Sequence, residues 1–258
     1  MAFFRYLLLA ALSLFAAVSV SGQRPFKVDS LKKEMANAPE EKKAVYYNQI
    51  CRMLRNSNPQ QAVEYGKKAI RSADAHKNYE ELAKAYSFAG VAFRNSGDFS
   101  QALAHYGLGK QIAEKHNLSQ QLGYAHINFA NVFIYTAEYR QAQKHLRTAD
   151  SLARSLQDPV MSAYTQLNKG RIYIALNRFD SARFFLDNAL QMRQAMRDVS
   201  GQAVCYRYIG DLEQKQGKTQ SALEAYDKAL EKTGSRFDND FLSDLYAGKA
   251  KIFLKQKH

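Results

Sequence analysis

The sequence predicts an all-α fold in which five helical hairpins, repeating every 40 residues, stack into a solenoid that a C-terminal helix follows. The first observation behind this prediction is the stretch 83–113. Apolar residues recur there at the i, i+3, i+4, i+7 spacing of a helix face, on both sides of the helix-breaking run Asn95-Ser96-Gly97-Asp98. Neither helix of such a hairpin buries its apolar stripe alone, so the hairpin needs neighbours.

The second observation is a set of three ladders in which apolar, mostly small residues recur at a spacing of 40. A fixed period of this length indicates a stacked repeat array. Small residues are required where two helices cross closely, because a larger side chain separates the helix axes. The ladders are Ala62, Ala102, Ala142, Ala182 and Ala222; Ala69, Gly109, Ala149, Ala189 and Ala229; and Ile50, Gly90, Ala130, Gly170 and Gly210.

Residues that start helices follow the same period and divide the chain into units. Asn78 has Glu81 three residues later, which predicts a capping box, and Pro159 stands at a first helical position. The register of helix caps holds Asn78, Leu118 (where we expect Ser119 to cap instead), Asp158, Asp198 and Asp238, and Pro39 holds the register of Pro159 in the first unit. The units are expected at about 39–77, 78–117, 118–157, 158–197 and 198–235, with a terminal helix at 239–255.

Within the units, aromatic and small residues alternate at fixed positions. The second unit carries Tyr86, Ala89-Gly90, Phe93, Phe99, Ala102, Tyr106 and Gly109, and the fifth carries Tyr206, Ile209-Gly210, Ala222, Tyr226 and Ala229. This pattern resembles the tetratricopeptide repeat family over roughly residues 39–255. The chain departs from the family in having no Trp, no helix-ending Pro and a period of 40 residues instead of about 34. It is similar to the longer-helix repeats of the extracytoplasmic region of bacterial signalling proteins, and the resemblance implies a right-handed superhelical solenoid.

The first 22 residues have the pattern of a secretory signal peptide. Arg5 precedes an apolar run over residues 6–20, and small residues then allow cleavage after Ser21 or Gly22. The apolar run is short for a membrane span, although an uncleaved anchor is the alternative interpretation. We therefore expect export to the periplasm or the cell surface, with no transmembrane span in the mature chain.

Each end of the array needs its own cover, because terminal units otherwise expose their packing faces. Residues 23–38 form a polar lead in which Val28, Leu31 and Met35, at helical spacing, predict a short docking helix against the first unit. At the other end, the helix expected at 239–255 has no partner helix. Such an open end can stack on a second copy, so self-association through the solenoid ends is one expectation.

The net charge of +13 does not point to nucleic acid as the partner. Lys and Arg are spread over every unit instead of clustering, and an exported chain rarely meets nucleic acid. Solvated outer faces explain most of the charge. The alternative is that the positive charge binds an acidic peptide or an anionic envelope surface. Cys51 and Cys205 lie four units apart and are expected to be unpaired, since a disulfide needs Cα atoms within about 4.4–6.8 Å.

No catalytic, cofactor-binding or metal-binding motif is present in the sequence. Gly107-Leu108-Gly109-Lys110 resembles a phosphate loop, but Gly109 holds a packing position, and Asp238-Asn239-Asp240 lacks the glycine and closing Glu of a calcium loop. His76 with His116, and His105 with His145, share registers, which reflects repeat duplication more than metal binding. A non-enzymatic function without a cofactor is expected.

The first helices of successive repeats line the concave surface of a solenoid, which is where such proteins bind. An Asn amide suits the main chain of an extended peptide, Tyr rings add contact area, and Arg171 and Arg207 can hold a carboxylate. The tetratricopeptide resemblance implies the same use of Asn and basic residues on these helices. The candidate groove residues are Asn48, Lys84, Asn95, Tyr124, Asn128, Asn131, Tyr135, Tyr164, Asn168, Arg171, Arg207, Tyr208 and Asp211.

Three hypotheses of function follow from these observations. The first is a protein-binding scaffold that holds an extended peptide or a partner protein in its concave groove. The second is the sensor region of a truncated bacterial histidine kinase or transcriptional regulator, in which a membrane span and an effector domain would follow the array. The third is an intracellular basic scaffold with an ordinary N-terminal helix, and a mature chain that begins near Gln23 would exclude it.

Overall fold

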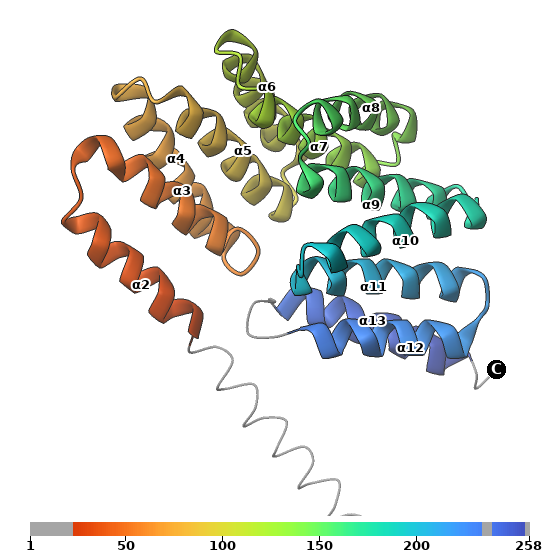
Figure 1. Ribbon diagram of the computed structural model, residues 1–258. Helices are drawn as coiled ribbons and strands as arrows, with labels where there is room; N and C mark the ends of the chain where they lie inside the picture. Colours follow the sequence, from red (N-terminus) through yellow and green to blue (C-terminus); the bar gives the residue numbers. More distant parts are fainter. Residues whose placement is uncertain (1–22, 234–238, 256–258) are drawn as a thin grey trace, which may run out of the picture.

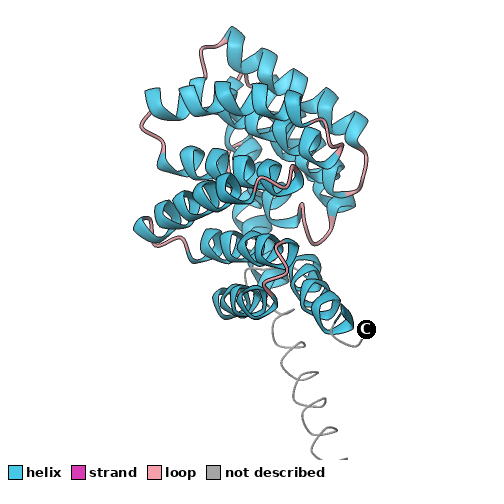
Figure 2. Ribbon diagram, turned by 90° about the vertical axis from the view of Figure 1, so that its right-hand side faces the viewer, coloured by secondary structure: helices cyan, strands magenta, loops and turns pink. Residues whose placement is uncertain are grey.

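The computed structural model describes residues 23–233 and 239–255, and every regular element in them is helical (Figures 1 and 2). The predicted all-α solenoid of repeats is confirmed. Figure 1 shows the helices following one another around a curved array from α2 to α13. The expected signal peptide and the expected helix start at Asp238 lie outside the described residues.

Five helical pairs form the array, and each pair packs on the next. The pairs are α3 (Lys43–Leu54) with α4 (Pro59–Ala75), α5 (Tyr79–Asn95) with α6 (Phe99–Lys115), α7 (Ser119–Tyr135) with α8 (Tyr139–Ser155), α9 (Pro159–Ala175) with α10 (Phe179–Ala195), and α11 (Val199–Lys215) with α12 (Thr219–Lys232). Before them, α2 (Gln23–Ala36) packs against α3, with Val28 buried, and a short 3-10 helix η1 (Glu40–Lys42) follows. After them, α13 (Asn239–Lys255) packs against α12 and α11.

The turns between helices explain why the sequence repeats every 40 residues. Helices α4 to α11 are all 17 residues long, and three residues separate each from the next. The middle residue of each turn has a left-handed backbone, and the third donates its N–H to the carbonyl five residues back, as from Asn78 to Ala73 O at 2.8 Å. These left-handed residues are Lys77, Gly97, Asn117, Ala137, Gln157, Asn177, Arg197 and Gly217.

The third residue of each turn is also the N-cap of the next helix. Asn78, Asp158 and Asp198 each accept a hydrogen bond from the backbone N–H three residues on, as predicted. Pro159 does occupy a first helical position. Pro39 differs, since it precedes the 3-10 helix η1 and makes no side-chain cap.

Two of the capping predictions are wrong. The capping box at Asn78 is incomplete, because the Asn78 N–H already donates to Ala73 O and the Glu81 carboxylate bonds Asn48 and Lys84 instead. Ser119 does not cap α7 either: it is the first residue of the helix, and Leu118 takes the N-cap position without a side-chain hydrogen bond.

The small-residue ladders lie in the core, where helices of one pair cross. A Cβ on Gly90 would lie 2.4 Å from the ring of Tyr106, and one on Gly210 would lie 2.6 Å from the ring of Tyr226. Gly109 packs closely against Tyr86 in the middle of α6, so it serves helix packing and not a phosphate loop.

Both thiols are buried and free, which confirms that Cys51 and Cys205 are unpaired. The two side chains lie on α3 and α11, at opposite parts of the array. Within residues 23–233 and 239–255, no helix combines the length and the apolar character needed to cross a membrane.

Candidate functional site

The first helices of the five pairs form the inner layer of the array. Each first helix contacts the next, in the series α3, α5, α7, α9 and α11, whereas no second helix in the described part of the chain touches the second helix of a neighbouring pair. Helices on the inside of a curved stack lie closer together than those outside. The inner helices are therefore α3, α5, α7, α9 and α11, and the face they share is called the inner face below.

Arg171 is the centre of a cluster on the inner face. Its Nη1 donates hydrogen bonds of 2.7 Å to Oδ1 of Asn131 on α7 and to Oδ1 of Asn168 on its own helix α9. Its guanidinium lies 5.5 Å from the ring centre of Tyr135 and 5.0 Å from that of Tyr208 on α11. One arginine thus joins three successive inner helices through hydrogen bonds and cation–π contacts.

Arg207 extends this cluster toward the C-terminal helix. Its guanidinium lies 4.8 Å from the same Tyr208 ring and pairs with Asp244 on α13 at 3.1 Å. Near it, Asp211 accepts a hydrogen bond of 2.7 Å from the hydroxyl of Tyr226. Burial raises the pKa of the Asp211 carboxyl above its ordinary value, while Arg207 and the Tyr226 hydrogen bond oppose that rise.

A second group of candidate residues lies at the N-terminal end and ties α3 to α5. The Asn48 amide donates to the main-chain oxygen of Glu81 at 2.9 Å and to its carboxylate at 2.7 Å. Lys84 pairs with the same carboxylate at 2.8 Å. Asn95 donates to Arg55 O at 2.8 Å, and so fastens the end of α5 to the turn after α3.

Two of the predicted asparagines are engaged within the fold. Asn48 and Asn168 are only 2% and 1% exposed, and their amides bond Glu81 of the next inner helix and Arg171 of the same helix instead of facing solvent. Asn128 and Asn131 are half-buried, and Tyr135 is 60% exposed. The half-buried asparagines and Tyr135 are therefore more accessible to solvent than Asn48 and Asn168.

The two remaining tyrosines lie near the starts of their helices, apart from the Arg171 cluster. The Tyr124 hydroxyl donates to Asp158 at 3.4 Å, and burial together with that carboxylate raises the pKa of Tyr124 above its ordinary value. The Tyr164 ring lies 4.3 Å from the guanidinium of Arg193, a buried residue of α10 that pairs with Asp198 at 2.6 Å. These contacts stabilise the junction between pairs.

Two residues of the cluster were not among the sequence candidates. Arg94 of α5 lies 5.9 Å from the ring centre of Tyr135, on which Arg171 also packs. Asp244 pairs with Arg207. The 40-residue period could have found Asp244, because it holds the register of Lys84, Tyr124 and Tyr164. Arg94 precedes Asn95 directly, but its own register continues as Ile134, Ile174 and Gln214 and so gives no consistent polar signal.

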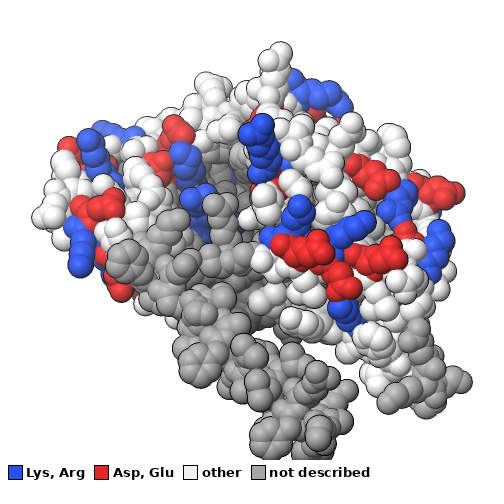
Figure 3. Space-filling model, turned by 60° about the horizontal axis from the view of Figure 1, so that its bottom comes forward, with Lys and Arg blue, Asp and Glu red and all other residues white. Residues whose placement is uncertain are grey.

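The distribution of charge can be followed on one face of the molecule. Figure 3 shows Lys and Arg scattered over the visible face with Asp and Glu between them. No Asp or Glu in the described part of the chain lies within ion-pair distance of Arg171, as is also true of most of the other cations there. Its positive charge is met only by amide oxygens and aromatic rings.

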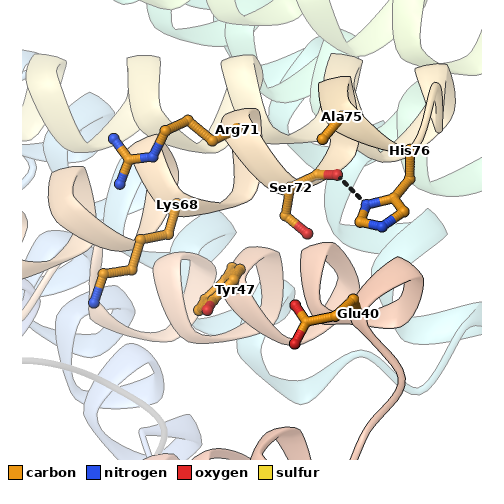
Figure 4. Close-up of a pocket in the computed structure, with 7 residues that line it drawn as sticks. All are labelled: Glu40, Tyr47, Lys68, Arg71, Ser72, Ala75 and His76. Carbon is orange, nitrogen blue, oxygen red and sulfur yellow. Dashed lines mark hydrogen bonds between the residues drawn. The ribbon is translucent and has the colours of Figure 1, made fainter.

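A shallow cavity of about 450 Å³ lies away from the inner-face cluster, between η1, α3 and α4 (Figure 4). Lys68 and Arg71 extend to one side of Tyr47, and Glu40 lies on the other side near His76. The wall therefore carries charges of both signs. The residues that line it are Glu40, Tyr47, Lys68, Arg71, Ser72, Ala75 and His76.

The histidines that share a register lie in separate local environments. His76 and His116 are C-cap residues, and His105 bonds the main-chain oxygen of Gln101 at 2.9 Å. His145 instead pairs with His126, their Nδ1 atoms 2.9 Å apart. Within the described ranges, no three His, Cys, Asp or Glu side chains are grouped so that they could hold a metal ion.

The fold and its inner face together identify this protein as a helical-repeat solenoid. The family model "Tetratricopeptide repeat" matches residues 160–232, which span α9 to α12. The sequence resemblance is thereby confirmed where the match lies. No curated protein matches the chain.

Solved structures share the fold at low sequence identity. BtubC (BKLC) from P. vanneervenii superposes with a TM-score of 0.60 and 16% identity, over 81% of this chain and 88% of that one. A signal transduction ATPase (STAND) protein with a tetratricopeptide repeat sensor, from Pyrococcus horikoshii, gives a TM-score of 0.60 and 14% identity. That match covers 94% of this chain but only 41% of the ATPase, and at these identities both show the fold alone.

Proposed function

We propose that this protein is a non-enzymatic scaffold that binds an extended segment of a partner protein on its inner face. The tetratricopeptide repeat fold supports a protein-interaction role in general. The observation that carries the finer proposal is the Arg171 cluster, in which a cation without a carboxylate partner lies beside a largely exposed Tyr135.

The chemistry of the cluster favours an acidic group on the bound segment. Asn131 and Asn168 fix Arg171 through one nitrogen, Nη1, and Tyr135 and Tyr208 hold the guanidinium plane. A guanidinium held in this way loses little conformational freedom when it binds a carboxylate. The exposed Tyr135 ring supplies apolar contact next to that charge.

Location and partners belong to the same proposal. The pattern of residues 1–22 supports export, so the partner is a protein of the periplasm or cell surface and not a nucleic acid. Self-association through the array's ends is treated separately below. The second candidate function is the sensor region of a signalling protein, and it is supported by the structural similarity to an ATPase whose tetratricopeptide repeats are described as a sensor.

The test is a cross-linking pull-down from the host's envelope fraction with tagged protein covering residues 23–258. The Tyr135→Ala, Arg171→Gln double variant should lose the specific partner. The matched control is Phe184→Ala with Arg154→Gln, which removes an equally exposed ring (61%) and an arginine from outer helices. Thermal melts by circular dichroism establish that both variants are folded.

The two outcomes separate the inner face from the rest of the surface. A partner lost only with the inner-face variant, and recovered with the control, supports the scaffold proposal. If both variants recover the same proteins as the unchanged chain, the inner face is not the binding site and the proposal fails.

A further inference from the structure

Helix α13 has two apolar faces, and only one of them is covered. Leu245 and Ile252 are buried against α12, in a cluster with Tyr226 and Ala229. On the other side Tyr246, Phe253 and Leu254 are 60%, 52% and 66% exposed, and Ala247 and Ala250 lie exposed between them. Apolar side chains that lie exposed next to one another on one helix face indicate an interaction surface, whereas single exposed apolar residues do not. This set of five is called the α13 face below.

By the 40-residue period, residues of the α13 face are equivalent to residues through which an inner helix packs on the second helix of its own pair. Tyr246, Ala250 and Phe253 lie four repeats after Tyr86, Gly90 and Phe93 of α5. In α5, Gly90 packs directly on Tyr106 of α6. In the described part of the chain, α13 touches only α11 and α12, so its equivalent surface is bare.

We propose that the α13 face binds the α13 face of a second copy, with the two helices antiparallel about a two-fold axis near Ala247. This inference goes beyond partner binding at Arg171 and does not depend on it. A two-fold contact uses the same patch on both copies, so the patch has to be complementary to itself.

The charges beside the α13 face are complementary to those of a second copy only if the two α13 helices are antiparallel. Asp244 and Lys251 are seven residues apart, which is about two helical turns, so they lie on one line with Ala247 between them. An antiparallel copy sets each Asp244 against Lys251 of the other copy, twice by symmetry. A parallel copy sets like charges together.

Both groups are placed to make these pairs. Lys251 is exposed, and the Asp244 side chain is 55% exposed although its Oδ2 pairs with Arg207 at 3.1 Å. Ala247 and Ala250 give the small surface that two helices need at a close crossing. Tyr246 and Leu254 then add apolar area on either side of the crossing.

Sedimentation equilibrium of residues 23–258 tests the proposal. The unchanged chain should be a dimer at about 100 µM, and Lys251→Glu should weaken dimerisation about tenfold at low salt, because two attractive pairs become repulsive. Asp244→Lys should do the same alone. Mixing the two variants should restore a dimer, since only the mixed pair has opposite charges at both contacts.

Cysteine cross-linking tests the axis without changing any charge. The native thiols are buried, so an Ala247→Cys variant carries one accessible thiol and should form a disulfide-linked dimer in mild oxidant. Ser151→Cys, on the exposed side of α8, is the control for random collisions.

Three results would overturn the proposal. The first is a monomeric chain at about 100 µM, including one that captures a helix of another protein instead. The second is a dimer that Lys251→Glu leaves unchanged. The third is cross-linking of Ala247→Cys no faster than that of Ser151→Cys. None of these results bears on the Arg171 site, so the two proposals fail separately.

Discussion

Tyr106 and Tyr226 hold the same position in the second and fifth pairs, yet only Tyr226 has a partner for its hydroxyl. Both rings are 0% exposed and pack on a glycine, Gly90 or Gly210. The Tyr226 hydroxyl donates to Asp211 at 2.7 Å, whereas the buried Tyr106 hydroxyl has no hydrogen-bond partner among the described residues. The register that gives Asp211 in the fifth pair gives Val91 in the second.

The two tyrosines should therefore respond in opposite ways to loss of the hydroxyl. Tyr226→Phe leaves the half-buried Asp211 carboxylate with one donor fewer and should lower the free energy of unfolding by about 1–3 kcal/mol. Tyr106→Phe removes an unpaired polar group and should be neutral or raise it by up to about 1 kcal/mol. Urea denaturation of both variants measures the difference. Equal losses would show that the hydrogen bond to Asp211 contributes nothing.

Close packing at Gly90 gives the second prediction. Gly90→Ala should cost about 1–3 kcal/mol, because the added methyl meets the Tyr106 ring and both helices have to separate. Gly107→Ala is the matched control, since nothing lies within 4 Å of a Cβ at that helical position. The control should gain about 0.5–1 kcal/mol from helix propensity. Thermal melts give the comparison, and a stable Gly90→Ala variant would contradict it.

Much of the fold could be predicted because close helix crossings constrain residue size, and size is visible in a sequence. Ala102 and Ala142 could be assigned to the core from their spacing alone, and both are 0% exposed. The turns were less visible. A left-handed residue there is required by the backbone hydrogen bonds of two consecutive helices, and the chain uses Ala137 or Arg197 as readily as Gly97.

Those turns supply the third prediction. A left-handed backbone costs a residue with a Cβ about 1–2 kcal/mol. Substitution by glycine removes this cost but adds about 0.5–1 kcal/mol, because glycine loses more conformational entropy on folding. Ala137→Gly and Arg197→Gly should each stabilise the protein by up to about 1 kcal/mol. Gly97→Ala should destabilise it, although no atom lies near its Cβ position. A Gly97→Ala variant as stable as the unchanged chain would show that these turns carry no strain.

The candidate site could be predicted only in part. Asn131 and Arg171 lie one period apart on inner helices, and the structure joins them by a hydrogen bond. The burial of Asn168 could not be foreseen, because it depends on the rotation of α9 against its neighbours. Nor does any period show that Arg171 reaches two tyrosine rings, since this depends on side-chain rotamers.

The pair His126 and His145 leads to a prediction about pH. His145 lies between α7 and α8, with its ring 4.9 Å from that of Phe129 and 5.5 Å from that of Phe133. Burial lowers the pKa of His145 from 6.5 to about 4, and His126, Lys144 and Lys110 add to the shift. The His126 pKa is also lowered, by burial and Lys110, while Glu114 opposes the change.

The sign of the effect follows from where protons bind. Between pH 6.5 and about 4 the unfolded chain binds a proton at residue 145 more readily than the folded chain does. Stability from the neutral ring is therefore complete above pH 6.5 and is lost as the pH falls toward 4. His145→Phe keeps the aromatic contact without the titration, so its free energy of unfolding should fall less between pH 7 and 4. Urea denaturation of both proteins at several pH values measures this difference. If the free energy of unfolding falls with pH by the same amount in both proteins, His145 does not have this role.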